Sequence, residues 1–283
     1  MDYKIYNEKY IFIKKNYLLK LVIELLLLFI IFLILFLKNN TKIESKENIN
    51  KIVLNLFKNN NKIPISLENK LKKMQNPLIE WPLPNKIKFK PCMRKEELIA
   101  FLSFMKPNRT YFEFGSGGST NVASYYKLKV YSVESDVLWH NILKKNNINA
   151  TYLTIDLKAK SNGWGFPGKD TSIEDWKKYF QAYQSKYNAD IIFIDGRFRV
   201  ICGLDIFQKI RNDTLILIHD YQRDIYHILE KYYIKVGKWG NLSAFFKNQN
   251  ITTIPQNVYN KYNYIIQLII ILKMAIIFLF FYF

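Results

Sequence analysis

Between residues 110 and 247, short runs of β-branched and aromatic residues alternate with longer segments of helical periodicity. Runs such as IIFID and LILIHD place apolar residues at consecutive positions, which is typical of strands covered on both faces. Strands of this kind joined by helices form a parallel sheet. We therefore predict an α/β fold with a Rossmann-like, doubly wound, mostly parallel sheet. The predicted strands are 110–114, 130–134, 150–156, 189–195 and 213–220, and the predicted helices are 119–127, 136–146, 172–187, 200–211 and 224–233.

A glycine-rich turn follows the first predicted strand. Residues 113–120 read EFGSGGST. Gly115 and Gly117 allow the backbone to approach a ligand closely, because glycine has no Cβ and tolerates positive φ. Glu134 ends the second predicted strand, where a carboxylate can accept hydrogen bonds from both hydroxyls of a ribose. This pattern indicates a nucleotide-like cofactor at the carboxyl ends of the strands.

Polar residues also end the fourth and fifth predicted strands. Asp195 ends one buried run, and His219 and Asp220 end the next. Because neighbouring strands end over one crevice, these residues are the predicted catalytic group, with His219 as a general base that Asp195 or Asp220 orients. A structural alternative stays open, in which Asp195 accepts N–H groups of the following turn and His219 is a half-buried polar residue.

Candidate acceptor-binding residues lie in two loops. Arg197 and Arg199 follow the fourth strand, where a guanidinium fork can hold a carboxylate or phosphate; alternatively, one of them pairs with Asp195 or Asp220. Residues 162–168, NGWGFPG, present Trp164 between glycines, which suits a lid, a sugar-stacking surface or a plug over the core.

Taken together, these motifs resemble those of class I S-adenosylmethionine-dependent methyltransferases, whose first motif runs acid-x-Gly-x-Gly and whose second strand ends in an acid. The resemblance covers about residues 95–247 and looks closest to a membrane-anchored branch of that superfamily. The matching motifs are EFGSGGST at 113–120, SVESD at 132–136 with Trp139, WGFP at 164–167, IDGRFRVIC at 194–202 and IHDY at 218–221.

The resemblance implies roles for residues of the cofactor site. S-adenosylmethionine would be held at its methionine part by Glu113, Gly115, Ser116 and Gly117, at its ribose by Glu134 and at its adenine edge by Asp156. The family fold usually ends in an antiparallel hairpin, for which 233–236 and 242–247 are the candidates.

The sequence assigns no metal ligands, although a divalent cation is possible. Some metal-dependent O-methyltransferases hold a divalent cation at the ends of the same two strands. Asp195 and Asp220 permit that arrangement, but oxygen ligands at unknown distance do not argue for it.

Two apolar segments are long enough to cross a bilayer core of about 30 Å. Residues 18–37 read LLKLVIELLLLFIIFLILFL. They are predicted to form a transmembrane helix, with a cleaved signal peptide as the alternative, because no small-residue cleavage site follows. Residues 264–283 are a second candidate span with Lys273 near its centre; a hydrophobic helix packed on the domain is the alternative. Lysines on both sides of the first segment leave its orientation open.

The remaining domain boundaries follow from composition. Residues 1–17 form a basic tail, residues 38–91 a Lys- and Asn-rich stalk, and residues 92–250 the methyltransferase-like domain. The formal net charge is +19, but more than half of the basic excess lies outside residues 92–247. We expect contact with membrane lipid and no specific nucleic-acid binding.

The expected function is membrane-anchored methyl transfer from S-adenosylmethionine, directed to an oxygen of an unidentified glycan, lipid or protein acceptor. One alternative is a non-catalytic binding or scaffold protein on the same fold. Another is a nucleotide-binding oxidoreductase, although its fingerprint requires glycine or alanine where the chain has Thr120. The two cysteines, Cys92 and Cys202, exclude a disulfide scaffold, and we expect both to be buried thiols.

Overall fold

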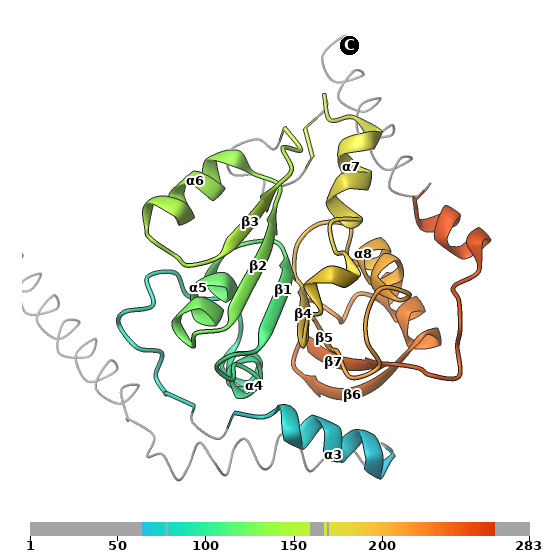
Figure 1. Cartoon of the computed structure of the whole chain (residues 1–283), viewed down its shortest axis with the longest axis horizontal. Helices are drawn as coiled ribbons and strands as arrows, with labels where there is room; N and C mark the ends of the chain where they lie inside the picture. Colours follow the sequence, from blue (N-terminus) through green and yellow to red (C-terminus); the bar gives the residue numbers. More distant parts are fainter. Residues whose placement is uncertain (1–63, 77–78, 159–166, 169, 264–283) are drawn as a thin grey trace, which may run out of the picture. The chain divides into compact units, whose positions relative to one another are not determined.

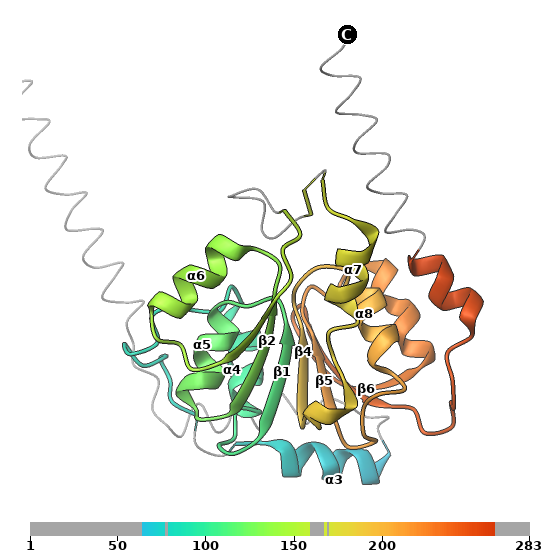
Figure 2. The same ribbon diagram turned by 45° about the horizontal axis from the view of Figure 1, so that its top comes forward.

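The computed structural model describes residues 64–76, 79–158, 167, 168 and 170–263. In this part of the chain, helices lie on both sides of a seven-stranded sheet (Figures 1 and 2). The strands are β1 (Thr110–Phe114), β2 (Lys129–Glu134), β3 (Thr151–Thr154), β4 (Ile191–Ile194), β5 (Leu215–Ile218), β6 (Tyr233–Trp239) and β7 (Leu242–Lys247). Their order across the sheet is β3-β2-β1-β4-β5-β7-β6.

Parallel pairing extends from β3 to β5. In the centre, Phe112 of β1 is paired with Tyr131 of β2 on one side and with Ile192 of β4 on the other. Antiparallel pairing begins at β7, where Ala244 is paired with Leu217 of β5. The predicted mostly parallel sheet with a C-terminal antiparallel hairpin is therefore confirmed, and β6 continues to Trp239, beyond its predicted end.

The central strands are buried on both faces. In β4, Ile191 and Phe193 belong to one apolar cluster, and Ile192 and Ile194 belong to the other. The first cluster includes residues of α3, α4 and α5, and the second includes residues of α7 and α8. This two-sided burial explains the unbroken apolar runs in the sequence. The α-helices are α3 (Ile65–Met74), α4 (Lys95–Ser103), α5 (Gly118–Tyr125), α6 (Val137–Lys145), α7 (Ile173–Phe180) and α8 (Arg199–Ile206), and a further helix covers 256–263.

Three predicted helices differ from the structure. The helix predicted over 200–211 forms α8, which ends at Ile206. The segment 172–187 forms α7, which ends at Phe180, and a separate 3₁₀ turn, η1 (Ser185–Tyr187). The chain then turns into β4 through Asn188 in the left-handed region, at φ 49°, a conformation that no helix continues. The segment 224–233 forms the 3₁₀ helix η2 (Asp224–Lys231).

The described part of the segment predicted as a stalk packs against the sheet. Leu67 and Leu71 of α3 are buried in the same cluster as Ile79, Leu83 and Ile87. These apolar residues are scattered through a segment rich in lysine, asparagine and proline, so the composition conceals them.

One of the two cysteine predictions was wrong. Cys202 is buried as expected, but Cys92 is exposed. Cys92 lies in the connection that precedes α4 and belongs to no helix or strand.

Several predictions lie outside the described residues: the basic tail 1–17, the segments 18–37 and 264–283, and Trp164. None of the helices described between residues 64 and 263 combines the length and apolar character needed to cross a bilayer.

Candidate functional site

The carboxyl ends of β1, β2 and β4 meet where the order of the parallel strands reverses direction. From β1, the sheet continues through β2 and β3 on one side and through β4 and β5 on the other. Gly115 N donates to Val133 O at 2.9 Å and Asp195 N donates to Phe114 O at 3.1 Å. The loops that follow β1 and β4 therefore begin side by side at this edge of the sheet. Open α/β sheets bind ligands at such a switch point.

Two glycines give the loop after β1 its shape. Gly115 has φ +95°, and a Cβ on it would lie 2.6 Å from the Cα of Gly196, so only glycine suits this position. Gly117 is extended, with φ 172°, and a Cβ there would meet no atom within 4 Å. A side chain at Gly117 would therefore fill the space beside the loop, which fits a cofactor lying against the backbone.

Glu113 lies beneath the loop. Its side chain is fully buried and accepts hydrogen bonds from Tyr111 Oη (2.9 Å), Ser119 Oγ (2.7 Å), Ser132 Oγ (2.7 Å) and Thr120 Oγ1. Burial raises the pKa of Glu113 to about 7, although these hydroxyl groups oppose the shift. Glu113 supports the loop from below, and its contact with the methionine part of a cofactor stays a prediction.

Ser116 connects the loop to the end of β2. Its N–H donates to Glu134 Oε2 at 3.0 Å, while Glu134 Oε1 accepts from Ser135 N (2.7 Å) and Asp136 N (2.8 Å). Trp139 Nε1 donates to Ser116 O at 2.9 Å. Burial raises the pKa of Glu134, and the three backbone N–H groups oppose that shift. Each carboxylate oxygen can accept two hydrogen bonds, so Oε2 can still accept one from a ribose hydroxyl.

Asp156 lies just beyond β3 at the same edge of the sheet. It accepts hydrogen bonds from Lys158 N (2.8 Å) and Lys158 Nζ (2.7 Å), and the side-chain hydrogen bond lowers its pKa. Ile155 N donates to Glu134 O at 2.8 Å, which places the two acidic residues on neighbouring strand ends. The adenine role of Asp156 stays a prediction.

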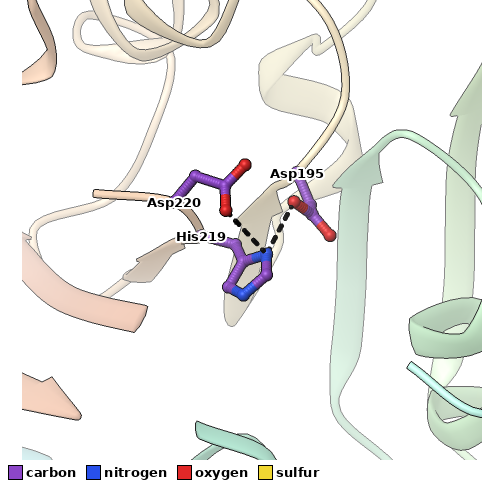
Figure 3. A group of neighbouring side chains, drawn as sticks. All are labelled: Asp195, His219 and Asp220. Carbon is purple, nitrogen blue, oxygen red and sulfur yellow. Dashed lines mark hydrogen bonds and ion pairs between the residues drawn. The ribbon is translucent and has the colours of Figure 1, made fainter. Parts of the chain in front are cut away.

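The three predicted catalytic residues come together at the ends of β4 and β5 (Figure 3). His219 Nδ1 lies 3.0 Å from Asp195 Oδ1 and 3.9 Å from Asp220 Oδ1. His219 is largely buried, with a side-chain exposure of 9%, whereas Asp195 and Asp220 are 30% and 25% exposed. The imidazole therefore lies behind the two carboxylates.

Sequence reasoning missed a fourth member of this group, Glu97 of α4. Its side chain is 1% exposed. Glu97 Oε2 lies 3.2 Å from His219 Nε2 and accepts from Arg94 N at 2.9 Å, and Oε1 accepts from Asn241 N at 2.8 Å. The sequence did offer a signal, since Glu97 shares the apolar face of α4 with Leu98 and Phe101. An acid on such a face becomes buried, and a buried carboxylate needs a partner.

The two carboxylates on either side of His219 control its protonation. Burial disfavours the imidazolium, but the hydrogen bond and charge of Asp195 and the hydrogen bond to Glu97 outweigh it and raise the pKa of His219. Burial likewise works against the Glu97 carboxylate, yet its hydrogen bonds keep its pKa below the usual value. The imidazolium can donate from Nε2 to Glu97 and from Nδ1 to Asp195, whereas the neutral imidazole has one N–H and can donate to only one of these carboxylates.

Arg199 is engaged inside the group. Its Nη2 lies 3.0 Å from Asp195 Oδ1 and its Nη1 lies 3.1 Å from Asp220 Oδ2. The same guanidinium donates to the carbonyl oxygens of Gly196, Asp195 and His219, and the side chain is 12% exposed. Arg199 therefore pairs with Asp195 and Asp220, as the alternative from the sequence proposed. Its contact with an acceptor stays a prediction.

Two of the non-glycine residues with positive φ lie in or beside this group. Phe198 and Asp220, which follow β4 and β5, both have φ 56°, a conformation that is unfavourable for side chains other than glycine. Strained residues of this kind concentrate at functional sites.

The group also has the composition of a cation site. One atom each from Asp195, His219 and Asp220 lies within 4.8 Å of the others, and carboxylate oxygens with an imidazole nitrogen suit divalent cations. The Arg199 guanidinium already contacts both carboxylates, so a divalent cation would have to compete with it for their oxygens.

Comparison with known proteins is consistent with this architecture. No protein-family model matches the chain, and no curated protein matches it significantly. Among solved structures, a methyltransferase-like protein from Silicibacter pomeroyi DSS-3 is similar, with 27% identity and a TM-score of 0.53 over 62% of this chain and 96% of that protein.

Two further methyltransferase structures are more distant. A TehB-like S-adenosylmethionine-dependent methyltransferase from Corynebacterium glutamicum has 11% identity and a TM-score of 0.34 over 52% of this chain and 85% of its own. The MycE methyltransferase of the mycinamycin biosynthetic pathway has 15% identity and a TM-score of 0.30 over 52% and 44%. The strand order, the glycine loop and the Silicibacter structure identify the fold as that of class I S-adenosylmethionine-dependent methyltransferases.

Proposed function

We propose that this chain is a membrane-anchored S-adenosylmethionine-dependent methyltransferase that methylates an oxygen atom of a glycan, lipid or protein acceptor. The hydrogen bond from Ser116 N to Glu134 carries the proposal, because it joins an open glycine loop to an acid at the switch point of the sheet. The Silicibacter methyltransferase-like structure supports the class of reaction.

The cofactor would lie along the carboxyl ends of β1, β2 and β3. The open space at Gly117 would admit it against the loop backbone, Glu134 Oε2 would accept a hydrogen bond from a ribose hydroxyl, and Asp156 would hold the adenine edge. When bound, S-adenosylmethionine supplies a methyl group made electrophilic by its sulfonium. This chain then has to orient the acceptor, exclude water and remove the hydroxyl proton.

The Asp195–His219 pair would receive that proton. Asp195 is more exposed than His219 and therefore meets the acceptor hydroxyl, and His219 Nδ1 lies 3.0 Å behind it. The imidazolium that forms is stabilised by Asp195 on one nitrogen and by Glu97 on the other. Arg199 and Asp220 hold the two strand ends in position.

Isothermal titration of the full chain in detergent with S-adenosylhomocysteine tests the cofactor assignment. We expect Glu134→Ala to weaken binding about tenfold, the effect of one lost charge-assisted hydrogen bond. Glu230→Ala is the matched control, because Glu230 is exposed and pairs with Lys235. A folded wild-type chain that binds NAD and not S-adenosylhomocysteine would contradict the proposal.

Catalysis is tested separately from binding. Transfer of labelled methyl groups from S-adenosylmethionine to a membrane extract should fall at least 100-fold in Asp195→Asn, with S-adenosylhomocysteine affinity within about twofold of the wild type. Equal transfer by the variant would refute the role of Asp195, and no transfer by a wild-type chain that binds S-adenosylhomocysteine would favour the scaffold alternative.

The proposed anchor rests on the apolar segment 18–37, supported by the second apolar segment 264–283. Removal of residues 1–37 should reduce the fraction of the chain that sediments with membranes after alkaline extraction. Unchanged sedimentation of a variant that also lacks 264–283 would exclude anchoring by these segments.

A further inference from the structure

Two guanidinium groups converge on Tyr226 and Asp220 beside the proposed catalytic group. The Cζ atoms of Arg199 and Arg223 lie 6.0 and 5.9 Å from the centroid of the Tyr226 ring. Both arginines also contact the same carboxylate oxygen, Asp220 Oδ2, each at 3.1 Å. Arg223 Nη1 lies 3.4 Å from Tyr226 Oη. The end of β5 is therefore lined by closely spaced positive charge.

Arg197 adds a third guanidinium to this neighbourhood. Burial is the main reason that its pKa is lowered, and the positive charges of Arg199 and Arg223 lower it further, while Tyr179 and Tyr226 oppose the shift. Arg197 follows β4 directly, and its N–H lies 3.2 Å from Tyr179 Oη. The positive charges of the two loops thus act on one another.

The group carries more positive than negative charge. Arg199 and Arg223 contact the carboxylates of Asp195 and Asp220, and the protonated His219 is balanced by Glu97. Arg197 in the neighbouring loop adds one further positive charge, so one positive charge is in excess while His219 is protonated. An anion placed here would be attracted by the whole group.

The arginines differ in what they can offer a ligand. Arg199 is 12% exposed and engaged with strand ends, whereas Arg223 is 57% exposed. A guanidinium presents five N–H donors in a planar fork, and Arg223 uses only part of that fork on Asp220 and Tyr226. Its outer edge can still bind an anion.

We propose that Arg223 and Arg197 bind a carboxylate or phosphate group of the acceptor, so that the acceptor is an anionic molecule with its reactive hydroxyl close to that group. The inference rests on the proposed function, for which it names the class of substrate. Asp220 connects the two parts of the site, because it contacts Arg223 at 3.1 Å and lies 3.9 Å from His219. Bidentate recognition by an arginine fork is well suited to both kinds of anion.

Binding of small anions to the full chain in detergent tests the proposal. The probes are inorganic phosphate and acetate, titrated at constant ionic strength. We expect saturable binding of at least one probe, weakened about tenfold by Arg223→Ala and less by Arg223→Lys, which keeps the charge but loses the fork. Lys178→Ala is the matched control, because Lys178 is 66% exposed and pairs with Asp175 three residues away, as Arg223 pairs with Asp220.

The outcomes separate this inference from the proposed function. Each variant is also titrated with S-adenosylhomocysteine, whose affinity should not change. If the wild type binds S-adenosylhomocysteine but neither anion, or if Lys178→Ala weakens anion binding as much as Arg223→Ala, the anion site is wrong and the methyltransferase proposal stands. If the chain binds an anion in an Arg223-dependent way but does not bind S-adenosylhomocysteine, the anion site stands and the methyltransferase proposal is wrong.

A third arm identifies the source of the anion. Phosphatidic acid is presented in mixed micelles of the same detergent and compared with phosphatidylcholine. Arg223-dependent competition by phosphatidic acid against bound phosphate supports a lipid headgroup. Phosphate binding that phosphatidic acid does not displace supports a water-soluble anionic acceptor.

Discussion

Replacing Glu97 by glutamine should destabilise the domain through the buried pair with His219. The carboxylate accepts three hydrogen bonds on its two oxygens: Arg94 N and His219 Nε2 on Oε2, and Asn241 N on Oε1. Glutamine has the same shape but only one acceptor oxygen. If that oxygen faces His219, the amide NH₂ faces Asn241 N–H, and two donors meet in a site that is 1% exposed.

The magnitude follows from these contacts. A buried donor without an acceptor costs about 1–3 kcal/mol, and the lost charge-assisted bond to the imidazolium adds about 1 kcal/mol. We therefore expect Glu97→Gln to lower the free energy of unfolding by about 2–4 kcal/mol near pH 6.

The pH range of this effect follows from the two pKa shifts. The pKa of Glu97 is lowered from 4.5, so its stabilisation is present above the unfolded value and lost as the pH falls through the folded one. The pKa of His219 is raised from 6.5, so the stabilisation of its cation is present below the unfolded value and lost as the pH rises through the folded one. The pair therefore stabilises the fold most between pH 4.5 and pH 6.5, and it stabilises the fold less at pH 8.

Urea unfolding followed by near-ultraviolet circular dichroism at pH 6 and pH 8 measures the effect. Glu96→Gln is the control, because Glu96 is the neighbouring residue of α4 and is exposed; its effect should stay below about 0.5 kcal/mol. The reasoning is refuted if the two variants lose equal stability, or if the loss in Glu97→Gln is the same at both pH values.

Further predictions concern the same site. Methyl transfer should rise with pH through an apparent pKa above 6.5, because neutral His219 is the proton acceptor and its pKa is raised; in a pH–rate profile Glu97→Gln should move that pKa downward. Gly117→Val should weaken S-adenosylhomocysteine binding at least tenfold in a calorimetric titration, with thermal stability unchanged, because its Cβ meets no protein atom within 4 Å. Gly115→Ala should instead destabilise the domain by about 1–3 kcal/mol in urea unfolding, since it combines φ +95° with a contact of 2.6 Å to Gly196; a wild-type midpoint would contradict the loop geometry.

Local residue patterns were sufficient to predict the sheet and many of the residues that meet at the carboxyl ends of its strands. Consecutive apolar residues in β4 and β5 encode burial on two faces, and the positions of Asp195, His219 and Asp220 after those strands predicted that they would meet. The glycine loop and Glu134 were also recognisable, because close backbone approach and strand-end acids depend on residue type and spacing along the chain.

Contacts between distant parts of the chain decided the rest. Glu97 reaches His219 across 122 residues. Arg223 meets Arg199 at Asp220 and Tyr226, and α3 packs into the core although it lies in a Lys-rich segment. The spacing of residues along the chain does not predict these contacts. They arise because folding removes charged and apolar groups from water together, and each buried group is then stabilised by whichever neighbour the topology brings to it.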